Sequence, residues 1–229
     1  MQHIRAVCFD LDDTLWDLAP VIPRAEAHLY DWFRAHYPRI TEVYDPAKLH
    51  QLRLEYGARH PELRHDLTAL RMAMLRRVFR DAGYDEAPAE DAFAVFNEKR
   101  NDVQLFDDVL PALERLATTH QLFAFTNGNA SLDSIGIADL FNGIVTAREI
   151  GLAKPDPQFF VTALNRIGVA PRHALHVGDH PENDIRAAVI AGMSAVWVNR
   201  GQAPWPLDDC RPDHEHADLA ELPELLTRD

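Results

Sequence analysis

The sequence predicts an α/β fold: a Rossmann-like parallel sheet core with an inserted all-helical cap domain. Two observations carry this prediction. Short apolar runs of strand-forming residues alternate with helix-like segments over much of the chain, and residues 17–102 break the alternation with helical patterns alone. Because parallel strands need crossover connections that are usually helical, the alternation favours a parallel sheet covered on both faces.

The predicted strands are short and apolar, and polar loop residues follow them. The first covers residues 4–9 and stops at the cluster Asp10-Leu11-Asp12-Asp13-Thr14. Similar runs lie at residues 122–126, 144–146, 174–178 and 195–198. Helical segments are expected at residues 158–167 and 184–191, each followed by a glycine that can end a helix.

The insertion predicts four helices with distinct beginnings and apolar faces. The first ends before Pro38, and the second opens at Asp45-Pro46, a cap followed by a first-turn proline. The third begins after Asp66, which is expected to be its N-cap. The apolar positions are Leu29, Phe33 and Tyr37 in the first helix, Leu49, Leu52 and Tyr56 in the second, Leu67, Leu70, Met74 and Val78 in the third, and Phe93 and Phe96 in the fourth. We therefore expect a catalytic core of residues 1–16 and 103–229 and a helical cap of residues 17–102.

Composition excludes several classes of protein. Hydrophobic residues make up 47% and charged residues 26%, as in ordinary globular proteins. The net charge of -13 would repel a polyphosphate backbone, so nucleic acid is not an expected partner. No apolar stretch approaches the roughly 20 residues that cross a bilayer, and the first residues do not resemble a secretory signal. With only Cys8 and Cys210 no disulfide framework is indicated, so we expect a cytoplasmic protein, monomer or homodimer, without a membrane partner.

Polar residues follow several of the predicted strands, where open parallel sheets bind ligands. Asp10 and Asp12 follow the first strand, and Thr126 ends the second. Lys154 lies in a loop ahead of a helix. The others are Asn127, Gly128 and Asn129 after the second strand, and Gly178, Asp179 and Asp184 after the fourth.

These residues resemble, in order, the four motifs of the haloacid dehalogenase superfamily. The first motif is Asp10-Leu11-Asp12-Asp13-Thr14, the second is Thr126, the third is Lys154, and the fourth is Gly178-Asp179 followed by Asp184. Each motif alone is weak, but together they span nearly the whole chain. The helical insertion after the first motif resembles the first cap type of the family, which can close on a ligand and exclude water.

The resemblance implies a magnesium-dependent phosphatase that acts through a phosphorylated aspartate. Asp10 would be the nucleophile and Asp12 the general acid and base. Magnesium would be held by Asp10, Asp179 and the backbone carbonyl of Asp12. Lys154 and Thr126 would contact the phosphoryl group, with a backbone N–H of Asn127 at a helix start. Thr14 and Asp184 would support the site, Asp184 by orienting Lys154 or a metal-bound water.

The expected substrate is a small phosphorylated metabolite. His65 and Arg71 are candidate contacts to the leaving group, together with Asn127, Gly128 and Asn129. The stretches 9–15, 65–68 and 126–129, with Arg71, also resemble bacterial phosphatases that act on flavin mononucleotide and on the phosphorylated ribitylaminouracil intermediate of riboflavin synthesis.

Two other functions remain open. A haloacid dehalogenase would use the first aspartate on an alkyl halide without magnesium, but Asp12 and Thr14 argue against it. A receiver module is also phosphorylated on aspartate, but it carries no helical insertion after its first strand. Trp16 is expected either to pack at the hinge or to line the pocket. His214-Glu215-His216 is expected to be a solvated loop, not a metal site.

Overall fold

The computed structural model describes residue 1 and residues 3–227, and the chain forms two compact units, each described by itself below. The sheet unit comprises Met1–Asp17, Gln104–Gly128 and Gly136–Asp229. The helical unit comprises Leu18–Val103 and Asn129–Ile135. The second segment of the helical unit follows the second strand of the sheet, a position at which the sequence pattern does not indicate a change of unit.

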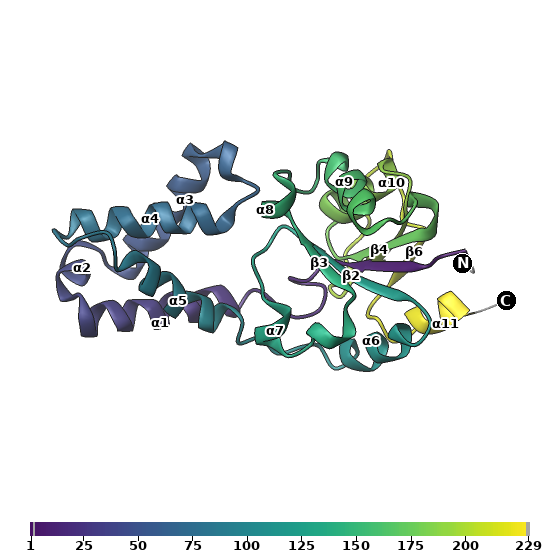
Figure 1. Cartoon of the computed structure of the whole chain (residues 1–229), viewed down its shortest axis with the longest axis horizontal. Helices are drawn as coiled ribbons and strands as arrows, with labels where there is room; N and C mark the ends of the chain where they lie inside the picture. Colours follow the sequence, from purple (N-terminus) through teal and green to yellow (C-terminus); the bar gives the residue numbers. More distant parts are fainter. Residues whose placement is uncertain (2, 228–229) are drawn as a thin grey trace. The chain divides into compact units, whose positions relative to one another are not determined.

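The sheet unit is built on six parallel strands in the order β3-β2-β1-β4-β5-β6 (Figure 1). Parallel neighbours β2 and β4 flank β1, so the carboxyl ends of these three strands lie along one edge of the sheet. The predicted α/β class with a parallel sheet is confirmed. The strands are β1 (Ala6–Phe9), β2 (Gln121–Thr126), β3 (Gly143–Thr146), β4 (Ala174–Gly178), β5 (Ser194–Val198) and β6 (His214–His216).

Helices cover both faces of this sheet, as Figure 1 shows for α9 and α10 on one face and α6 on the other. Ala6 and Cys8 of β1 pack with Phe159 and Ala163 of α9 in one buried cluster. All four residues of β1 are buried, because a strand covered on both faces has no solvent side. The helical elements of the sheet unit are α6 (Val109–Ala117), α8 (Ala147–Ile150), α9 (Pro157–Ile167), a π-helical turn η4 (Pro181–Arg186), α10 (Ala187–Ile190), α11 (Leu222–Thr227) and the short turns η2 (Ala138–Leu140) and η3 (Pro171–His173).

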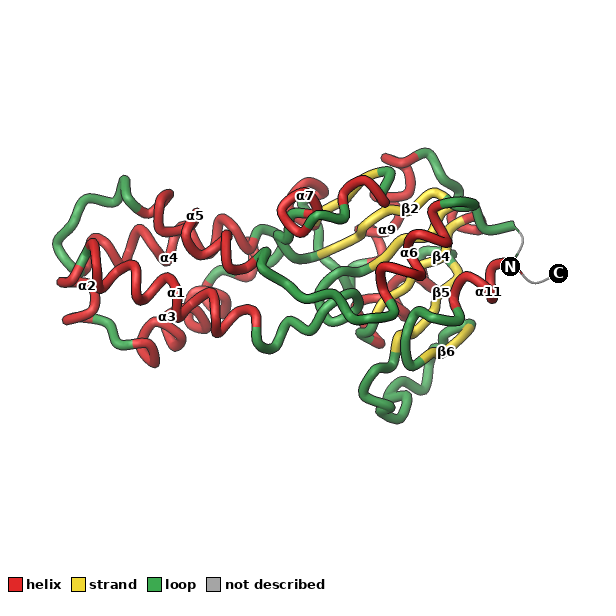
Figure 2. Tube along the Cα trace, turned by 90° about the horizontal axis from the view of Figure 1, so that it is seen from below, coloured by secondary structure: helices red, strands yellow, loops and turns green. Residues whose placement is uncertain are grey.

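The helical unit contains no strand among the residues that the structure describes, and Figure 2 shows all the strands in the sheet unit. Its buried core includes Phe33 of α1, Phe79 of α4 and Phe96 of α5. Two short helices, α2 and α7, were not predicted as separate elements. The helices are α1 (Val21–His36), α2 (Pro38–Val43), α3 (Pro46–Arg59), α4 (Leu67–Asp81), α5 (Ala89–Arg100) and α7 (Leu132–Ile135), with a short turn η1 (Pro61–Leu63).

The predicted caps of the helical unit are confirmed. The Asp45 side chain accepts a hydrogen bond from the Lys48 backbone N–H at 2.8 Å, and α3 begins with Pro46. The Asp66 side chain accepts from the Ala69 backbone N–H at 2.9 Å at the start of α4. Each cap satisfies a backbone donor that has no partner within its own helix.

The prediction of a loop at His214-Glu215-His216 is wrong. These residues form β6, which pairs with Val196–Val198 of β5 at the edge of the sheet. Its side chains are polar and show no apolar alternation, so the sequence carries no strand pattern at this position. In the part of the chain that the structure describes, no helix is both long and apolar enough to span a membrane.

Candidate active site

Three strand ends bring the first, second and fourth motifs together in the sheet unit. Asp10 follows β1, Thr126 is the last residue of β2, and Asp179 follows β4. Phe9, the last residue of β1, lies beside Ala124 of β2 and Val177 of β4. Because these neighbouring strands run parallel, their polar C-terminal residues meet at one edge of the sheet.

Lys154 lies between two carboxylates at this edge. Its Nζ atom is 2.8 Å from Oδ1 of Asp10 and 2.6 Å from Oδ1 of Asp184, and it also donates to the Phe125 carbonyl at 3.0 Å. The Lys154 and Asp184 side chains are 2% and 0% exposed, so water screens their interaction little. The lysine of the third motif is therefore a buried cation held by three oxygen atoms.

Asn127 holds the backbone of Lys154. Its side-chain amide donates to the Lys154 carbonyl and accepts from the Lys154 N–H, both at 2.8 Å. The expectation that Asn127 lies at a helix start is wrong, because the next helix begins only at Leu132. Residues 126–128 instead form a tight turn in which the Gly128 N–H donates to Oγ1 of Thr126 at 2.9 Å. This hydrogen bond leaves the hydroxyl proton of Thr126 available as a donor.

The first motif folds into a turn that fixes Asp12 and Thr14. Nε1 of Trp16 donates to Oδ1 of Asp12 at 2.9 Å, and the Trp16 side chain is fully buried. Trp16 was expected either to pack at the hinge or to line the pocket, and neither role predicted its hydrogen bond to Asp12. Oγ1 of Thr14 donates to Oδ1 of Asp179 at 3.0 Å, which links the first motif to the fourth. Asp13 has φ of 63°, a left-handed conformation that aspartate tolerates in turns.

The fourth motif needs its glycine because the chain passes very close to Asp184. A β-carbon on Gly178 would overlap the carboxylate carbon of Asp184. Oδ2 of Asp184 accepts from the His180 backbone N–H at 3.0 Å, and the Asp179 carbonyl accepts from Nε1 of Trp197 at 2.7 Å. The fourth motif is therefore packed so tightly that a residue with a β-carbon does not fit at position 178.

His176 is a site residue that the sequence reasoning missed. It lies on β4 and is fully buried, with Nε2 2.9 Å from Oδ1 of Asp184. Its ring packs edge to face on Phe160 with centroids 4.8 Å apart. Burial lowers the pKa of His176, which favours a neutral ring that donates Nε2–H to the carboxylate. A polar residue inside an otherwise apolar strand was the one sign of it in the sequence.

The site holds more negative charge than its lysine balances. Burial alone would lower the pKa of Lys154, but Asp10 and Asp184 outweigh burial and hold that pKa above its usual range. Burial would raise the pKa of Asp184, but the Lys154 ammonium and the His176 hydrogen bond hold it well below its usual range. Burial raises the pKa of Asp10 well above its usual range, although Lys154 opposes it. Burial and the nearby Asp184 carboxylate raise the pKa of Asp179 to about 7.

The donor set fits a hard divalent cation. One carboxylate oxygen from each of Asp10, Asp179 and Asp184 lies within 4.8 Å of the others. Both oxygens of Asp184 are already engaged, Oδ1 by Lys154 and His176 and Oδ2 by the His180 N–H. Asp10 and Asp179 are therefore the better placed ligands, and carboxylate oxygen is the donor that magnesium prefers.

The remaining candidates, His65, Arg71 and Asn129, belong to the helical unit. His65 is half-buried and precedes the cap residue of α4. The guanidinium carbon of Arg71 lies 3.5 Å from the centre of the Phe96 ring, and burial lowers the pKa of Arg71 to about 10. Asn129 donates to Oγ1 of Thr68 and accepts from Nε of Arg100, both at 3.3 Å. Contact of these three residues with a substrate stays a prediction.

Comparison with known proteins identifies the family. Residues 4–192 match the family model described as haloacid dehalogenase-like hydrolase. Since this match covers most of the chain, the protein belongs to the haloacid dehalogenase-like hydrolases. The predicted resemblance is confirmed, and so is the class of enzyme, a phosphoric monoester hydrolase of this superfamily, which the phosphatase relatives support.

Three relatives illustrate the family. The chain is 32% identical over 202 residues to 5-amino-6-(5-phospho-D-ribitylamino)uracil phosphatase YigB of Escherichia coli strain K12, which covers 86% of this chain and 84% of the relative. It is 36% identical over 241 residues to glyceraldehyde 3-phosphate phosphatase of Methanopyrus kandleri, with 97% of each chain covered. It is also similar to the crystal structure of a 2-haloacid dehalogenase from Pseudomonas syringae pv. Tomato DC3000, with 42% identity, a TM-score of 0.90 and 98% and 99% of the two chains covered.

Proposed function

We propose that this protein is a magnesium-dependent phosphatase that hydrolyses a small phosphate monoester through an aspartyl-phosphate on Asp10. The observation that carries the proposal is the position of Asp10. Its carboxylate follows a buried strand, lies 2.8 Å from the Lys154 ammonium and shares an edge of the sheet with Asp179. A nucleophile, a fixed cation and a second metal-binding carboxylate are thereby brought together.

Charge is the main obstacle to this reaction, because both the nucleophile and the phosphate are anionic. Two unit charges about 4 Å apart interact by roughly 4 kcal/mol at an effective dielectric of 20. Lys154 offsets part of this repulsion but already faces Asp10 and Asp184. Magnesium held by Asp10, Asp179 and the backbone carbonyl of Asp12 would supply the remaining positive charge and polarise a phosphoryl oxygen.

In this scheme Asp10 accepts the phosphoryl group and Asp12 transfers the protons. A carboxylate oxygen of Asp10 forms a bond to phosphorus as the bond from phosphorus to the leaving oxygen breaks, and Asp12 gives that oxygen its proton. Asp12, now ionised, takes a proton from the water that attacks the aspartyl-phosphate. Phosphate leaves and Asp10 is restored. The hydrogen bond from Trp16 to one Asp12 oxygen supports this role, because it holds the carboxylate in a fixed orientation.

Lys154 and Thr126 have positioning and electrostatic roles in the same scheme. The ammonium of Lys154 is fixed by Asp184 and the Phe125 carbonyl, so it need not reorganise as charge develops on the phosphoryl oxygens. The Thr126 hydroxyl accepts from Gly128 and so presents its own proton to a phosphoryl oxygen. We also propose that the helical unit acts as a cap that excludes water during the reaction.

For the substrate, we propose a phosphate of the riboflavin pathway or flavin mononucleotide. The similarity to the Escherichia coli ribitylaminouracil phosphatase supports this, as does the stretch from His65 to Arg71 noted in the sequence. The main alternative substrate is a triose phosphate, because one relative is named glyceraldehyde 3-phosphate phosphatase. Measurement of kcat/KM for flavin mononucleotide, ribitylaminouracil phosphate and glyceraldehyde 3-phosphate tests the choice, and a strong preference for the triose would reject it.

The reaction itself is tested with a generic aryl phosphate, assayed with magnesium and with excess EDTA. We expect turnover with the metal and none after chelation, and restoration when magnesium is added back. Acid quenching during turnover should trap phosphate on Asp10, and mass spectrometry of peptides locates it. Undiminished hydrolysis in EDTA would contradict the role of the metal, and a phosphate-free Asp10 peptide would contradict the covalent intermediate.

A second candidate is a 2-haloacid dehalogenase, favoured by the similarity to the Pseudomonas syringae structure of that name. Asp10 would then attack carbon and release halide, which needs neither a carboxylate at Asp12 nor a metal. In this chain Asp12 and Thr14 are present, and Thr14 is hydrogen-bonded to Asp179. Halide release from 2-chloropropionate in EDTA would establish this activity, and phosphate release without halide release would exclude it.

A further inference from the structure

Arg200, in the loop after β5, reaches two separate segments of the sheet unit. Its NH1 and NH2 atoms donate to the two carboxylate oxygens of Asp108 at 2.9 and 2.8 Å. Its NH2 and Nε atoms also donate to the Thr14 carbonyl oxygen, at 3.0 and 3.3 Å. One guanidinium therefore binds both the carboxylate that precedes α6 and the backbone of the first motif.

The guanidinium of Arg200 is held in a fixed orientation. Its central carbon lies 3.8 Å from the centre of the Phe106 ring. Asp108 is itself held by the Leu219 backbone N–H at 2.8 Å. Because a guanidinium is planar and its paired bonds to a carboxylate fix its plane, the N–H groups that face Thr14 point in a defined direction. The Thr14 carbonyl is thus positioned by the surrounding sheet unit.

Thr14 connects this arrangement to a carboxylate of the fourth motif. Thr14 is fully buried, and its Oγ1 donates to Oδ1 of Asp179 at 3.0 Å. The carbonyl and the hydroxyl belong to one residue, so fixing the carbonyl limits where the hydroxyl can lie. We propose that Arg200 is a positioning residue, which acts through Thr14 to hold Asp179 in place for magnesium. This inference rests on the proposed function, since that function assigns the metal to Asp179.

The charge of Arg200 predicts the opposite effect, which makes the positioning role testable. A cation near a metal site repels the metal, so removing the charge alone would strengthen metal binding. Loss of a group that orients a metal ligand weakens metal binding instead, commonly by about 10- to 100-fold. The direction of the change in metal affinity therefore separates the two effects.

The test measures Mn²⁺ binding to the full chain without substrate, by electron paramagnetic resonance of the free ion. Mn²⁺ takes the same carboxylate and water ligands as magnesium. We expect Arg200→Met to bind Mn²⁺ about tenfold more weakly than the wild type, and Thr14→Val to weaken binding at least as much. In the double variant Arg200→Met should cost no further affinity, because the hydroxyl that it positions is already absent.

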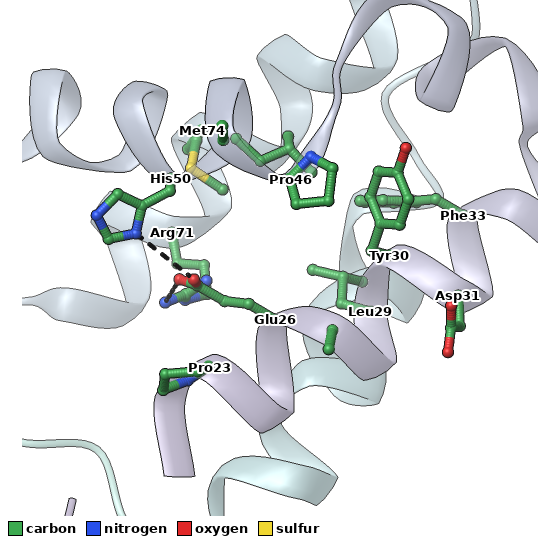
Figure 3. Close-up of a pocket in the computed structure, with 13 residues that line it drawn as sticks. Pro23, Glu26, Leu29, Tyr30, Asp31, Phe33, Pro46, His50, Arg71 and Met74 are labelled. Atoms are coloured by element: carbon green, nitrogen blue, oxygen red, sulfur yellow. Dashed lines mark ion pairs between the residues drawn. The ribbon is translucent and has the colours of Figure 1, made fainter. Parts of the chain in front are cut away.

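Arg53→Met is the matched control for the loss of an arginine from an ion pair. Nε of Arg53 lies 2.9 Å from Oε1 of Glu26, and both residues belong to the helical unit. Glu26 lines a pocket of about 430 Å³ that is formed by residues of α1, α3 and α4, and Figure 3 shows it there beside Arg71. We expect Arg53→Met to leave Mn²⁺ affinity unchanged, because Asp179 belongs to the sheet unit.

Thermal melting checks that each variant folds, and Arg200→Lys replaces Arg200→Met if the latter does not. A single ammonium cannot make the paired bonds to Asp108 and also bind Thr14, so we expect weaker Mn²⁺ binding that again disappears as an effect in the Thr14→Val background.

Asp179→Asn provides the reference for loss of the metal site. If the wild type bound Mn²⁺ no more tightly than Asp179→Asn, both the metal in the proposed function and this inference would be overturned. If the wild type bound more tightly, three results would overturn the inference alone: unchanged or tighter binding by the Arg200 variant, additive losses with Thr14→Val, or an equal loss in Arg53→Met.

Discussion

Oδ1 of Asp184 lies 2.6 Å from Nζ of Lys154, and both side chains are buried. Neither charge could stay in this position alone, because an unpaired buried ion is costly. The pair therefore stabilises the sheet unit only as long as both members are present, and it holds the ammonium within 2.8 Å of Asp10.

Lys154→Met tests this pairing, since it removes the charge and keeps the length of the side chain. We expect the free energy of unfolding to fall by about 3 to 5 kcal/mol, because Asp10 and Asp184 are left without their cation. Urea unfolding followed by circular dichroism measures this change. Lys48→Met is the matched control, at an exposed position where we expect a change within about 0.5 kcal/mol. Equal losses in the two variants would contradict the buried ion pair.

Replacement of the nucleophile tests the chemistry. Asp10→Asn should abolish turnover while the protein still folds, because an amide neither attacks phosphorus nor holds the metal. Asp12→Asn should slow turnover by about 100- to 10,000-fold, the usual contribution of a positioned acid or base. Steady-state assays with an aryl phosphate measure both effects. Wild-type activity in Asp10→Asn would show that the covalent mechanism is wrong.

His176 is predicted to act by positioning Asp184. His176→Phe keeps the ring volume but removes the donor to Oδ1, so we expect a lower kcat with little change in KM. His176→Gln can donate a hydrogen bond from its side-chain amide and should recover part of the lost kcat. A hydrogen bond to a charged group contributes about 1.5 to 3 kcal/mol, so the loss of stability in the phenylalanine variant should be of that order. If glutamine and phenylalanine gave the same kcat, the hydrogen bond would have no part in catalysis.

Gly178→Ala should be strongly destabilising, because its β-carbon would overlap Asp184. We expect a loss of about 2 kcal/mol or more, together with reduced activity, since Asp184 must move away from Lys154. Gly57→Ala is the same substitution in α3, where nothing lies within 4 Å of the new carbon. There we expect a gain of about 0.5 to 1 kcal/mol from the helix propensity of alanine. Thermal or urea unfolding of the two variants measures the contrast.

Asp108 should make the stability of the sheet unit depend on pH. Its carboxylate accepts from NH1 and NH2 of Arg200 at 2.9 and 2.8 Å and from the Leu219 N–H at 2.8 Å. Burial would raise the pKa of Asp108, but these hydrogen bonds outweigh burial and lower it. A carboxyl whose folded-state pKa is lowered contributes stability above its unfolded pKa of about 3.9 and loses it as pH falls through the folded value.

We therefore expect Asp108→Asn to be less stable than the wild type at neutral pH and to approach it in stability as the pH falls below the unfolded pKa of about 3.9 and through the lowered folded-state pKa. Urea unfolding of both proteins across this range measures the difference. A gap that stays constant down to the lowest pH would show that the Asp108 charge is not responsible.

Local sequence patterns were enough to predict most of the strands of the sheet and the longer helices of the helical unit. The family resemblance implies a helix start at Asn127, whereas the next helix begins at Leu132 and the Asn127 side chain holds the backbone of Lys154, which is distant in the sequence. The strand β6 escaped prediction because its residues are polar and its partner β5 lies well before it in the chain. His176 was overlooked for a related reason, since its partner Asp184 comes from another element.

The sequence by itself determined the parallel α/β class, the helical insertion and the residues of the four motifs, because each of these is written in short-range periodicity and in residue types at element ends. Only the tertiary structure decided which charged groups form ion pairs and which polar groups are hydrogen-bonded to one another. It placed Lys154 between Asp10 and Asp184 and His176 behind Asp184, and it formed the pocket of the helical unit. Burial and distance govern these interactions, and both arise only when strands and helices far apart in the chain pack together.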